Sequence, residues 1–225
     1  MILCDLPYGT TKNKWDVVIP FAPLWAQYEQ LIKPNGAIVL TAQSTFAYEL
    51  ALSNKKLFRY DLVWHKKGKA TGFLNANRMP LRNHELILVF YKSLPTYNPQ
   101  KTQGAPNHRR RGSHSRGTKQ TNNNYGKFDQ SFESEPTTDK FPLSVLTFPS
   151  VHPPIHPTQK PVELMEYLIL TYTNEGETVL DNCMGSGTTG EACQISNRNF
   201  IGIENDPQHF QTAYSRLVPT YPELD

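Results

Sequence analysis

The sequence predicts an α/β fold built around a mostly parallel, doubly wound sheet. Short apolar runs alternate with longer stretches in which apolar residues recur at helical spacing, a pattern typical of parallel strands joined by crossover helices. A glycine-rich turn, Gly185-Ser186-Gly187, separates one such run from the start of a helical pattern. A strand, a glycine turn and a helix in this order form the nucleotide-pocket unit of doubly wound sheets, because glycine lets a ligand approach the main chain closely.

The composition indicates one globular core without a membrane anchor. The chain has 225 residues, of which 38% are hydrophobic and 19% charged, and its net charge is +3, so it can bury one core with a small appended element. It contains no run of 18 apolar residues and no secretory signal. The three cysteines, Cys4, Cys183 and Cys193, are scattered without a CxxC pair. We therefore expect free thiols, no zinc site and a cytoplasmic location.

The first half of the chain predicts alternating strands and helices. In order these are a strand over 1–4, a helix over the second half of 16–33, a strand over 37–40, a helix over 44–54 capped by Ser44, and strands over 60–64 and 85–91. The last two strands are rich in β-branched and aromatic residues. No helical pattern lies between them, so we expect them to form an antiparallel hairpin.

The last third of the chain predicts two further strands, each followed by a helix. An amphipathic helix over 161–173, with Pro161 in its first turn, comes first. It is followed by a strand that begins at 178–180, a helix over 188–196, a strand over 199–204 and a helix over 207–217.

The segment between 95 and 150 has a different character, with many Asn, Gln, Ser, Thr, Gly and Pro residues and little periodicity. Its part from 101 to 127 carries no acidic residue but several basic ones, Arg109, Arg110, Arg111, Arg116 and Lys119. Such a run is typical either of a solvated loop or of a surface that neutralises phosphates. Its place inside an otherwise near-neutral chain favours the phosphate-binding interpretation.

Two short motifs carry the candidate chemistry. Asp5-Leu6-Pro7-Tyr8 follows the first apolar run and combines a carboxylate, a proline-fixed turn and an aromatic ring. These groups are suited to holding a planar amine, although an ordinary turn can have the same pattern. Glu204 ends the strand after the glycine turn, at the spacing of an acid that binds ribose hydroxyls.

Together the motifs resemble those of S-adenosylmethionine-dependent DNA amino-methyltransferases. Asp5-Leu6-Pro7-Tyr8 is similar to the catalytic Asp-Pro-Pro-Tyr motif of that family, with Leu6 in place of the first proline, and 181–188 resembles its glycine-rich cofactor motif. The segment His156-Pro157-Thr158-Gln159-Lys160-Pro161 is similar to the one that precedes the cofactor strand. The catalytic motif comes first and the cofactor motif last, as in the circularly permuted β group.

The resemblance implies a Rossmann-like methyltransferase fold and a role for each motif. Residues 1–94 would form the catalytic half, 95–150 an inserted target-recognition region, and 151–225 the cofactor-binding half. The implied catalytic residues are Asp5, Leu6, Pro7 and Tyr8. The implied cofactor-binding residues are Asp181, Met184, Gly185, Gly187, Thr188, Glu204 and Lys160, although Lys160 could equally contact a substrate phosphate or start a helix. The implied DNA-binding residues are Lys66, Arg109, Arg110, Arg111, Arg116 and Lys119.

The function that this resemblance implies is methyl transfer from S-adenosylmethionine to the N6 amine of adenine in double-stranded DNA. N4-cytosine methylation, glutamine methylation of a protein and a DNA-binding remnant without turnover remain alternatives. A homodimer and a cognate restriction nuclease are further implied partners. In that family a strand with an acid for the adenine of the cofactor precedes the catalytic strand. Because this sequence begins almost at Asp5, we expect that strand to be missing and cofactor binding to be weaker than in a full-length relative.

Overall fold

The computed structural model describes residues 1–106, 137–155 and 158–218. The chain divides into two compact units, the larger formed by Met1–Pro99 with Leu143–Asp225 and the smaller by Gln100–Pro142. The larger unit holds a seven-stranded sheet in the order β7-β3-β4-β2-β1-β8-β9. Its strands are β1 (Ile2–Asp5), β2 (Ile38–Ala42), β3 (Phe58–Lys67), β4 (His84–Phe90), β7 (Val145–Pro149), β8 (Thr178–Asp181) and β9 (Asn199–Gly202).

The sheet is mostly parallel, as the sequence predicts. β1 runs parallel to β2 and β8, β8 parallel to β9, and β3 parallel to β7. Only β4 opposes its neighbours, because it is antiparallel to both β2 and β3. The predicted antiparallel hairpin of the third and fourth strands is therefore confirmed. β3 extends beyond both predicted ends, whereas β4 begins and ends one residue earlier than predicted.

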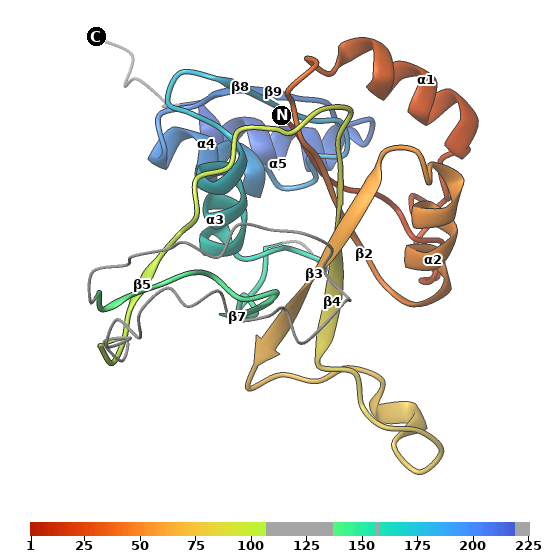
Figure 1. Ribbon diagram of the computed structural model, residues 1–225. Helices are drawn as coiled ribbons and strands as arrows, with labels where there is room; N and C mark the ends of the chain where they lie inside the picture. Colours follow the sequence, from red (N-terminus) through yellow and green to blue (C-terminus); the bar gives the residue numbers. More distant parts are fainter. Residues whose placement is uncertain (107–136, 156–157, 219–225) are drawn as a thin grey trace, which may run out of the picture. The chain divides into compact units, whose positions relative to one another are not determined.

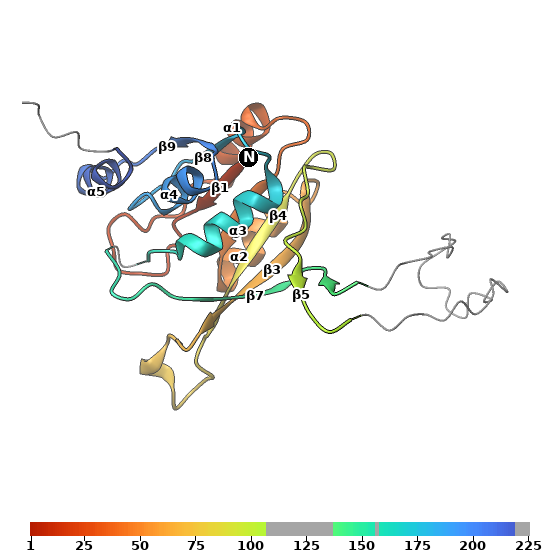
Figure 2. The same ribbon diagram turned by 90° about the vertical axis from the view of Figure 1, so that its left-hand side faces the viewer.

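Helices cover both faces of the sheet (Figures 1 and 2). They are α1 (Phe21–Leu31), α2 (Ser44–Ser53), α3 (Val162–Tyr172), α4 (Thr188–Ile195) and α5 (Pro207–Leu217). Successive strand residues point to opposite faces. Ile2 and Cys4 therefore pack with α1 and α2, whereas Leu3 packs with α3 and α4. A strand that is buried on both faces reads as a continuous apolar run, which is why β1 and β2 could be predicted.

Two predicted helix starts need correction. Ser44 does not cap α2, because it is the first helical residue, with φ 56°, and Gln43 occupies the N-cap position without a side-chain bond. The Ser44 hydroxyl instead accepts a hydrogen bond from Arg82 Nη2 at 3.4 Å. Pro161 is the N-cap of α3, with extended backbone, and so precedes the first turn.

β7 was not predicted at all. It lies within the polar segment 95–150, yet its residues pair in parallel register with Val63–Lys67 of β3. In the part of the chain that the structure describes, β8 is the one strand that pairs with β9. The predicted effect of a missing strand on cofactor binding stays a prediction.

The smaller unit contains a short antiparallel pair, β5 (Thr102–Gln103) with β6 (Asp139–Lys140). Gln103 Nε2 donates to Asp139 Oδ1 at 2.8 Å, and Lys101 forms an exposed ion pair with Asp139 at 3.5 Å. The predicted DNA-binding residues Arg109, Arg110, Arg111, Arg116 and Lys119 lie outside the described residues. No helix in the described ranges is long and apolar enough to cross a membrane.

Candidate functional site

A cavity of about 640 Å³ opens at the carboxyl ends of β1 and β8. Asp5 and the residues after it line one side, and Asp181 to Gly185 line the other. β1 and β8 are parallel neighbours, so the residues that follow them meet at the same edge of the sheet. This edge is the usual ligand site of open α/β sheets. The structure therefore brings the two motifs of the sequence, which lie at opposite ends of the chain, into one site.

The carboxylate of Asp5 is held by three side chains. Its Oδ1 accepts hydrogen bonds from the Tyr8 hydroxyl at 2.7 Å and from the Thr41 hydroxyl, and its Oδ2 accepts from Lys160 Nζ at 2.6 Å. The Asp5 side chain remains 21% exposed. A carboxylate has about four acceptor positions, so Asp5 can still accept a hydrogen bond from a group inside the cavity.

Lys160 belongs to a row of alternating charges that leads away from Asp5. Its side chain is 6% exposed, and its ammonium lies 2.6 Å from Asp5 and 3.3 Å from Glu85 Oε2. Glu85 Oε1 in turn pairs with Lys66 at 2.5 Å. The four formal charges of Lys66, Glu85, Lys160 and Asp5 cancel, as buried charges require.

The pKa shifts within this row favour the charged forms. Burial alone would raise the pKa of Glu85, but the charges of Lys160 and Lys66 outweigh burial and lower it below 4.5. Burial alone would lower the pKa of Lys160, but the carboxylates of Asp5 and Glu85 raise it above 10.5. Lys66, predicted to contact DNA, and Lys160, predicted to contact cofactor or phosphate, both line the cavity. In this structure their ammonium groups are directed at carboxylates, a pairing that the sequence analysis missed, and their predicted ligand contacts remain predictions.

The other residues of the first motif also line the cavity. The Tyr8 ring packs against Phe46, with ring centroids 5.0 Å apart. Burial, followed by the charge of Asp5, raises the pKa of the Tyr8 hydroxyl, so it stays a donor to Asp5. Leu6 is buried in the core and Pro7 half-buried at the wall, so the substitution of leucine for proline is accommodated by packing.

Asp16 holds the loop that follows the first motif, and this loop lines part of the cavity. Its carboxylate accepts hydrogen bonds from the amides of Gly9, Thr10 and Thr11 at 2.8, 2.9 and 2.6 Å. Burial tends to raise the pKa of Asp16, but these hydrogen bonds outweigh it and lower the pKa. From the same loop, the Trp15 ring meets His209 of α5 edge-on, with centroids 6.2 Å apart. The sequence analysis did not identify this loop.

Asp181 stabilises the glycine turn through hydrogen bonds to residues at both ends of the turn. It is 2% exposed; its Oδ2 accepts from the Thr189 hydroxyl at 2.6 Å and its Oδ1 from the Cys183 amide at 3.1 Å. Burial raises its pKa to about 6, although these hydrogen bonds oppose the rise. From α1, Tyr28 donates to Asn182 Oδ1 at 2.6 Å and thereby ties the same turn to the opposite face of the sheet.

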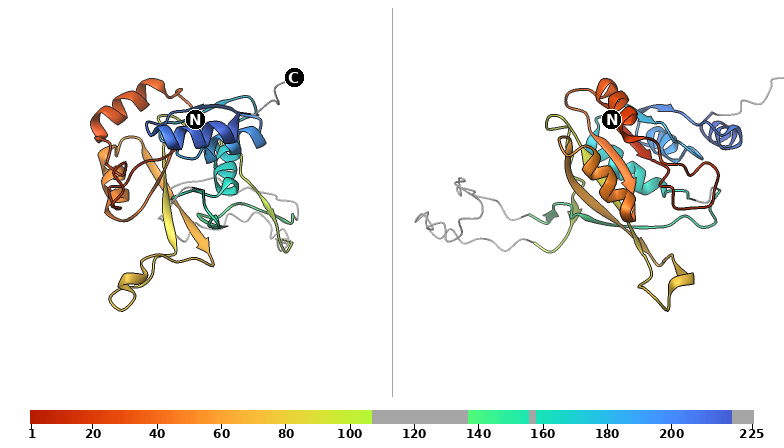
Figure 3. Two further views of the ribbon diagram at one scale, coloured as in Figure 1. Left: turned by 180° about the vertical axis from the view of Figure 1, so that it is seen from behind. Right: turned by 90° about the vertical axis from the view of Figure 1, so that its right-hand side faces the viewer.

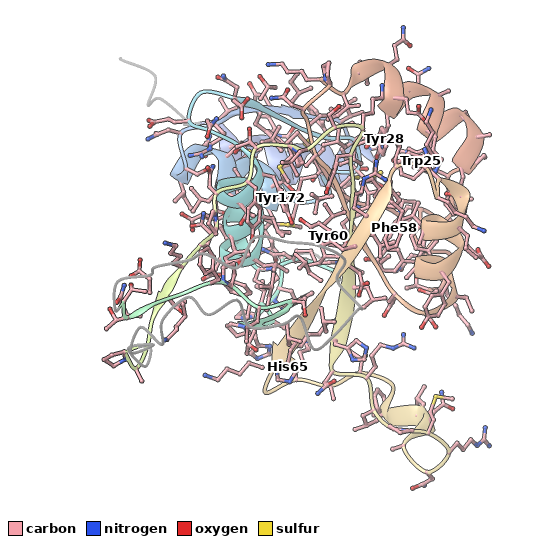
Figure 4. The ribbon with its side chains drawn as sticks, in the orientation of Figure 1. Trp25, Tyr28, Phe58, Tyr60, His65 and Tyr172 are labelled. Atoms are coloured by element: carbon pink, nitrogen blue, oxygen red, sulfur yellow. The ribbon has the colours of Figure 1, made fainter. Side chains whose placement is uncertain are left out.

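Aromatic side chains contact one another on both faces of the sheet (Figure 4). Trp25 and Tyr28, both on α1, meet edge-on with centroids 5.9 Å apart. On the other face of the sheet, the hydroxyls of Tyr60 on β3 and Tyr172 on α3 are 2.8 Å apart.

Glu204 links the glycine turn to the loop after β9. Its Oε2 accepts from the Gly185 amide at 2.9 Å and its Oε1 from the Asp206 amide at 3.0 Å. The cavity is lined by Glu204, Gly185, Met184 and Thr188, and their predicted cofactor contacts stay predictions.

Gly187 has a packing role that the spacing of the glycine turn did not indicate. It is not among the described residues that line the cavity, and a Cβ on it would lie 3.1 Å from Ala213 and Leu217 of α5. With φ 80° it is the N-cap of α4. Its missing side chain therefore lets α4 and α5 approach each other, and its predicted cofactor contact stays a prediction.

Thr41 is a second residue of the site that the sequence analysis missed. It is the polar residue in the fully buried strand β2, next to the last residue, and it lies directly opposite Asp5 in the register of the two strands. A polar residue at the carboxyl end of the strand beside the first motif is the signal that could have identified it.

Solved structures of DNA methyltransferases resemble this protein. The M1.HpyAVI–SAM complex is 28% identical and matches with a TM-score of 0.62, over 96% of this chain and 88% of that one. PvuII DNA methyltransferase, which is cytosine-N4-specific, matches with a TM-score of 0.65 over 97% and 79% of the two chains. At 15% identity, this second match shows the fold alone.

Curated relatives include type II methyltransferases and a DNA adenine methyltransferase. The type II methyltransferase M.HpaI of Haemophilus parainfluenzae is 26% identical over 100% of this chain and 70% of its own length. The type II methyltransferase M2.DpnII of Streptococcus pneumoniae is 47% identical, but the match spans only 28% of this chain and 23% of that protein. The DNA adenine methyltransferase YhdJ of Escherichia coli is 41% identical over 35% of this chain and 28% of its own length. A family model described as DNA methylase matches residues 1–215. The Asp5–Tyr8 motif and the glycine turn line one cavity, and the family match covers nearly the whole chain. The chain therefore belongs to the DNA methylase family.

Proposed function

We propose that this protein transfers a methyl group from S-adenosylmethionine to the exocyclic N6 of adenine in double-stranded DNA. The observation that carries the proposal is the single cavity in which Asp5 and Tyr8 face the turn of Asp181 and Gly185. The family model, described as DNA methylase, and the name of YhdJ support a DNA substrate, and the name of YhdJ also supports adenine. The M1.HpyAVI–SAM complex supports the cofactor.

The residues at the glycine end of the cavity fit S-adenosylmethionine. The cavity volume, about 640 Å³, lies within the range of small-molecule sites. Asp181 and Glu204 supply negative charge, which suits a ligand with a sulfonium and an ammonium group. Each carboxylate oxygen of Glu204 accepts one hydrogen bond from a backbone amide. Each oxygen can still accept another hydrogen bond, from a ribose hydroxyl. Gly185, with φ 53°, leaves its backbone open to the ligand. We assign the cofactor to Asp181, Met184, Gly185, Thr188 and Glu204.

Asp5 and its neighbours act on the amine. The lone pair of an exocyclic amine is conjugated with the base, so the nitrogen is a weak nucleophile. Asp5 accepts one N–H and the backbone carbonyl of Leu6 or Pro7 accepts the other, which draws the nitrogen toward a tetrahedral shape. Asp5 also stabilises the positive charge that develops on the nitrogen. Because Tyr8, Thr41 and Lys160 hold the carboxylate, it is oriented before the substrate arrives.

The remaining steps need little further machinery. When bound, S-adenosylmethionine supplies an electrophilic methyl group, whose bond to sulfur breaks as the bond to nitrogen forms. The extra proton on the methylated nitrogen is acidic and leaves to water without a strong base. The target base must leave the DNA stack to reach the cavity, and the ring of Tyr8 gives it an aromatic surface against which to pack.

Methyl transfer with radiolabelled S-adenosylmethionine and unmethylated bacterial DNA tests the proposal, followed by nucleoside analysis of the product. Label on adenine supports it. Label on cytosine favours the N4-cytosine alternative, and retention of DNA without label favours a binding remnant. Homodimerisation, a companion nuclease and a cytoplasmic location stay predictions.

An Asp5→Ala variant tests the mechanism. We expect a loss of at least about 100-fold in transfer rate, with cofactor affinity from calorimetry changed by less than about threefold. Lys160 keeps its contact with Glu85 in this variant, so the fold is retained. Asp61→Ala, an exposed aspartate on β3, is the matched control and should retain wild-type activity. If Asp5→Ala retains most of its activity, the assigned role of Asp5 is wrong.

A further inference from the structure

The connection between β3 and β4 projects away from the sheet as a narrow hairpin (Figures 1 and 3). Backbone hydrogen bonds in both directions, at 2.7 and 3.0 Å, join Thr71 and Arg82 at its base. A short 3-10 helix, η1 (Phe73–Asn75), forms its tip. The hairpin is therefore an ordered part of the larger unit, held by backbone hydrogen bonds at its base and by a short helix at its tip.

The tip of the hairpin exposes large apolar side chains. Phe73 is 78% exposed and Leu74 84% exposed, and Met79 and Leu81 are exposed behind them. Burying such side chains would be favourable by about 1.5–3 kcal/mol each. Leaving them in water contributes nothing to the fold of this chain. A cluster of this kind on a projection is typical of an interaction element.

The charges on the hairpin select the partner. Residues 66–83 carry five basic residues and no acidic one, although the whole chain has a net charge of only +3. Lys66 is engaged by Glu85, and Arg82 donates to Gln43 Oε1 at 3.1 Å. Lys67, Lys69 and Arg78 are exposed. Apolar side chains flanked by cations complement the stacked bases and phosphates of nucleic acid.

The base of the hairpin is at the cavity. Lys66, Lys69 and Thr71 line the cavity together with Asp5. The cavity is also lined by Gln43, which accepts a hydrogen bond from Arg82 of the hairpin. A nucleic acid that reaches Asp5 therefore passes close to this element.

We propose that residues 68–83 form a DNA wedge. Phe73 and Leu74 enter the base stack beside the target nucleotide, while Lys69 and Arg78 neutralise the adjacent phosphates. This inference rests on the proposed function, because it assigns how duplex DNA is opened for the cavity. Apolar side chains inserted between base steps partly unstack and untwist a duplex, and a flipped base must be released from the same stack.

Two double variants of the full chain separate the parts of the wedge. Phe73→Ala/Leu74→Ala removes the apolar tip, and Lys69→Gln/Arg78→Gln removes two cations. Leu94→Ala is the matched control, because Leu94 is 79% exposed but follows the other end of β4. All four substituted side chains of the double variants are exposed, so thermal melts should match wild type.

We expect the apolar variant to methylate unmethylated duplex DNA at least about tenfold more slowly than wild type, since unstacking is no longer assisted. On heat-denatured DNA its rate should stay within about twofold of wild type. With the charge variant, the slope of log affinity against log salt for a random-sequence duplex should become shallower by about 2, or about 0.9 for each lost phosphate contact. Leu94→Ala should behave as wild type in both assays.

A further readout does not depend on turnover. Wild type, but not the apolar variant, should lower the linking number of a plasmid relaxed by topoisomerase in its presence. If wild type changes the linking number but methylates no DNA, the proposed function fails and the wedge stands. The wedge is overturned if the apolar variant untwists the plasmid as wild type does, if it loses activity equally on duplex and denatured DNA, or if the charge variant keeps the wild-type salt slope.

Discussion

Lys160→Met should destabilise this protein strongly, because it removes the cation that separates two carboxylates. The ammonium of Lys160 lies 2.6 Å from Asp5 and 3.3 Å from Glu85, and the three side chains are 6%, 21% and 8% exposed. At an effective dielectric constant of about 20, attractions at these distances amount to about 6 and 5 kcal/mol. The cost of taking the ammonium out of water offsets much of this sum.

The expected net loss can be narrowed from the contacts that remain. Removal of one partner of a buried pair costs about 3–5 kcal/mol. Lys66 still neutralises Glu85 in the variant, and Asp5 keeps its bond from Tyr8. We therefore expect the lower end, a loss of about 3 kcal/mol in the free energy of unfolding at neutral pH. Urea titration followed by circular dichroism measures it. Lys101→Met, which breaks the exposed pair with Asp139, is the control and should cost less than about 1 kcal/mol.

The pH dependence gives a second test of the same pairing. In wild type the pKa of Glu85 is lowered from 4.5, so its contribution to stability is present above 4.5 and is lost as the pH falls through the lowered value. Lys160→Met removes the larger of the two causes of that lowering. Protonation of Glu85 at acid pH relieves the carboxylate that has lost Lys160 in the variant, so the difference in stability between the two proteins should narrow below pH 4.5. A gap under about 1 kcal/mol at neutral pH, or one that is unchanged at acid pH, would refute the assigned pairing.

Three further predictions concern the glycine turn and α5. Burial raises the pKa of Asp181 from 3.8 to about 6. The stability that the protonated form provides is therefore lost as the pH rises through about 6. Between acid and neutral pH, the free energy of unfolding of Asp181→Asn should rise by up to about 3 kcal/mol relative to that of wild type, as measured by urea titration. Gly187→Ala should lower stability by about 2 kcal/mol through left-handed strain and crowding against α5, with cofactor affinity unchanged. Gly176→Ala, with φ 76° and nothing within 4 Å of its Cβ, should lose less. Asp206 accepts from the amides of Gln208 and His209 at the start of α5, so Asp206→Ala should cost about 1 kcal/mol in a thermal melt; an unchanged melting temperature would show that this cap is not stabilising.

Six of the seven strands of the sheet and the meeting of the two motifs could be predicted from the sequence, because both depend on local patterns. β1 and β2 are buried on both faces and therefore appear as unbroken apolar runs. Once a parallel sheet is inferred, residues that follow parallel strands are expected at one edge. Asp5 and Gly185 follow this rule.

The partners of Lys160 could not be predicted, because they depend on which strands become neighbours. Glu85 reaches Lys160 only because β4 lies beside β2, with its sequence direction reversed. The spacing of the glycine turn could not show that Gly187 packs against α5, because that contact depends on where α5 lies in the fold. β7 was missed because pairing with β3 stabilises a strand that the composition of its segment does not favour.

The pairing of β1 with β8 also has a consequence for how the protein folds. Ile2 aligns with Leu180, and most of the described chain lies between them in sequence. During translation β1 and its neighbour β2 leave the ribosome long before β8 has been made. Contacts of such high sequence separation form slowly, and an apolar strand with one unpaired side is prone to aggregation in the meantime. The two walls of the cavity should therefore be joined late in folding, which predicts that refolding yield falls with protein concentration.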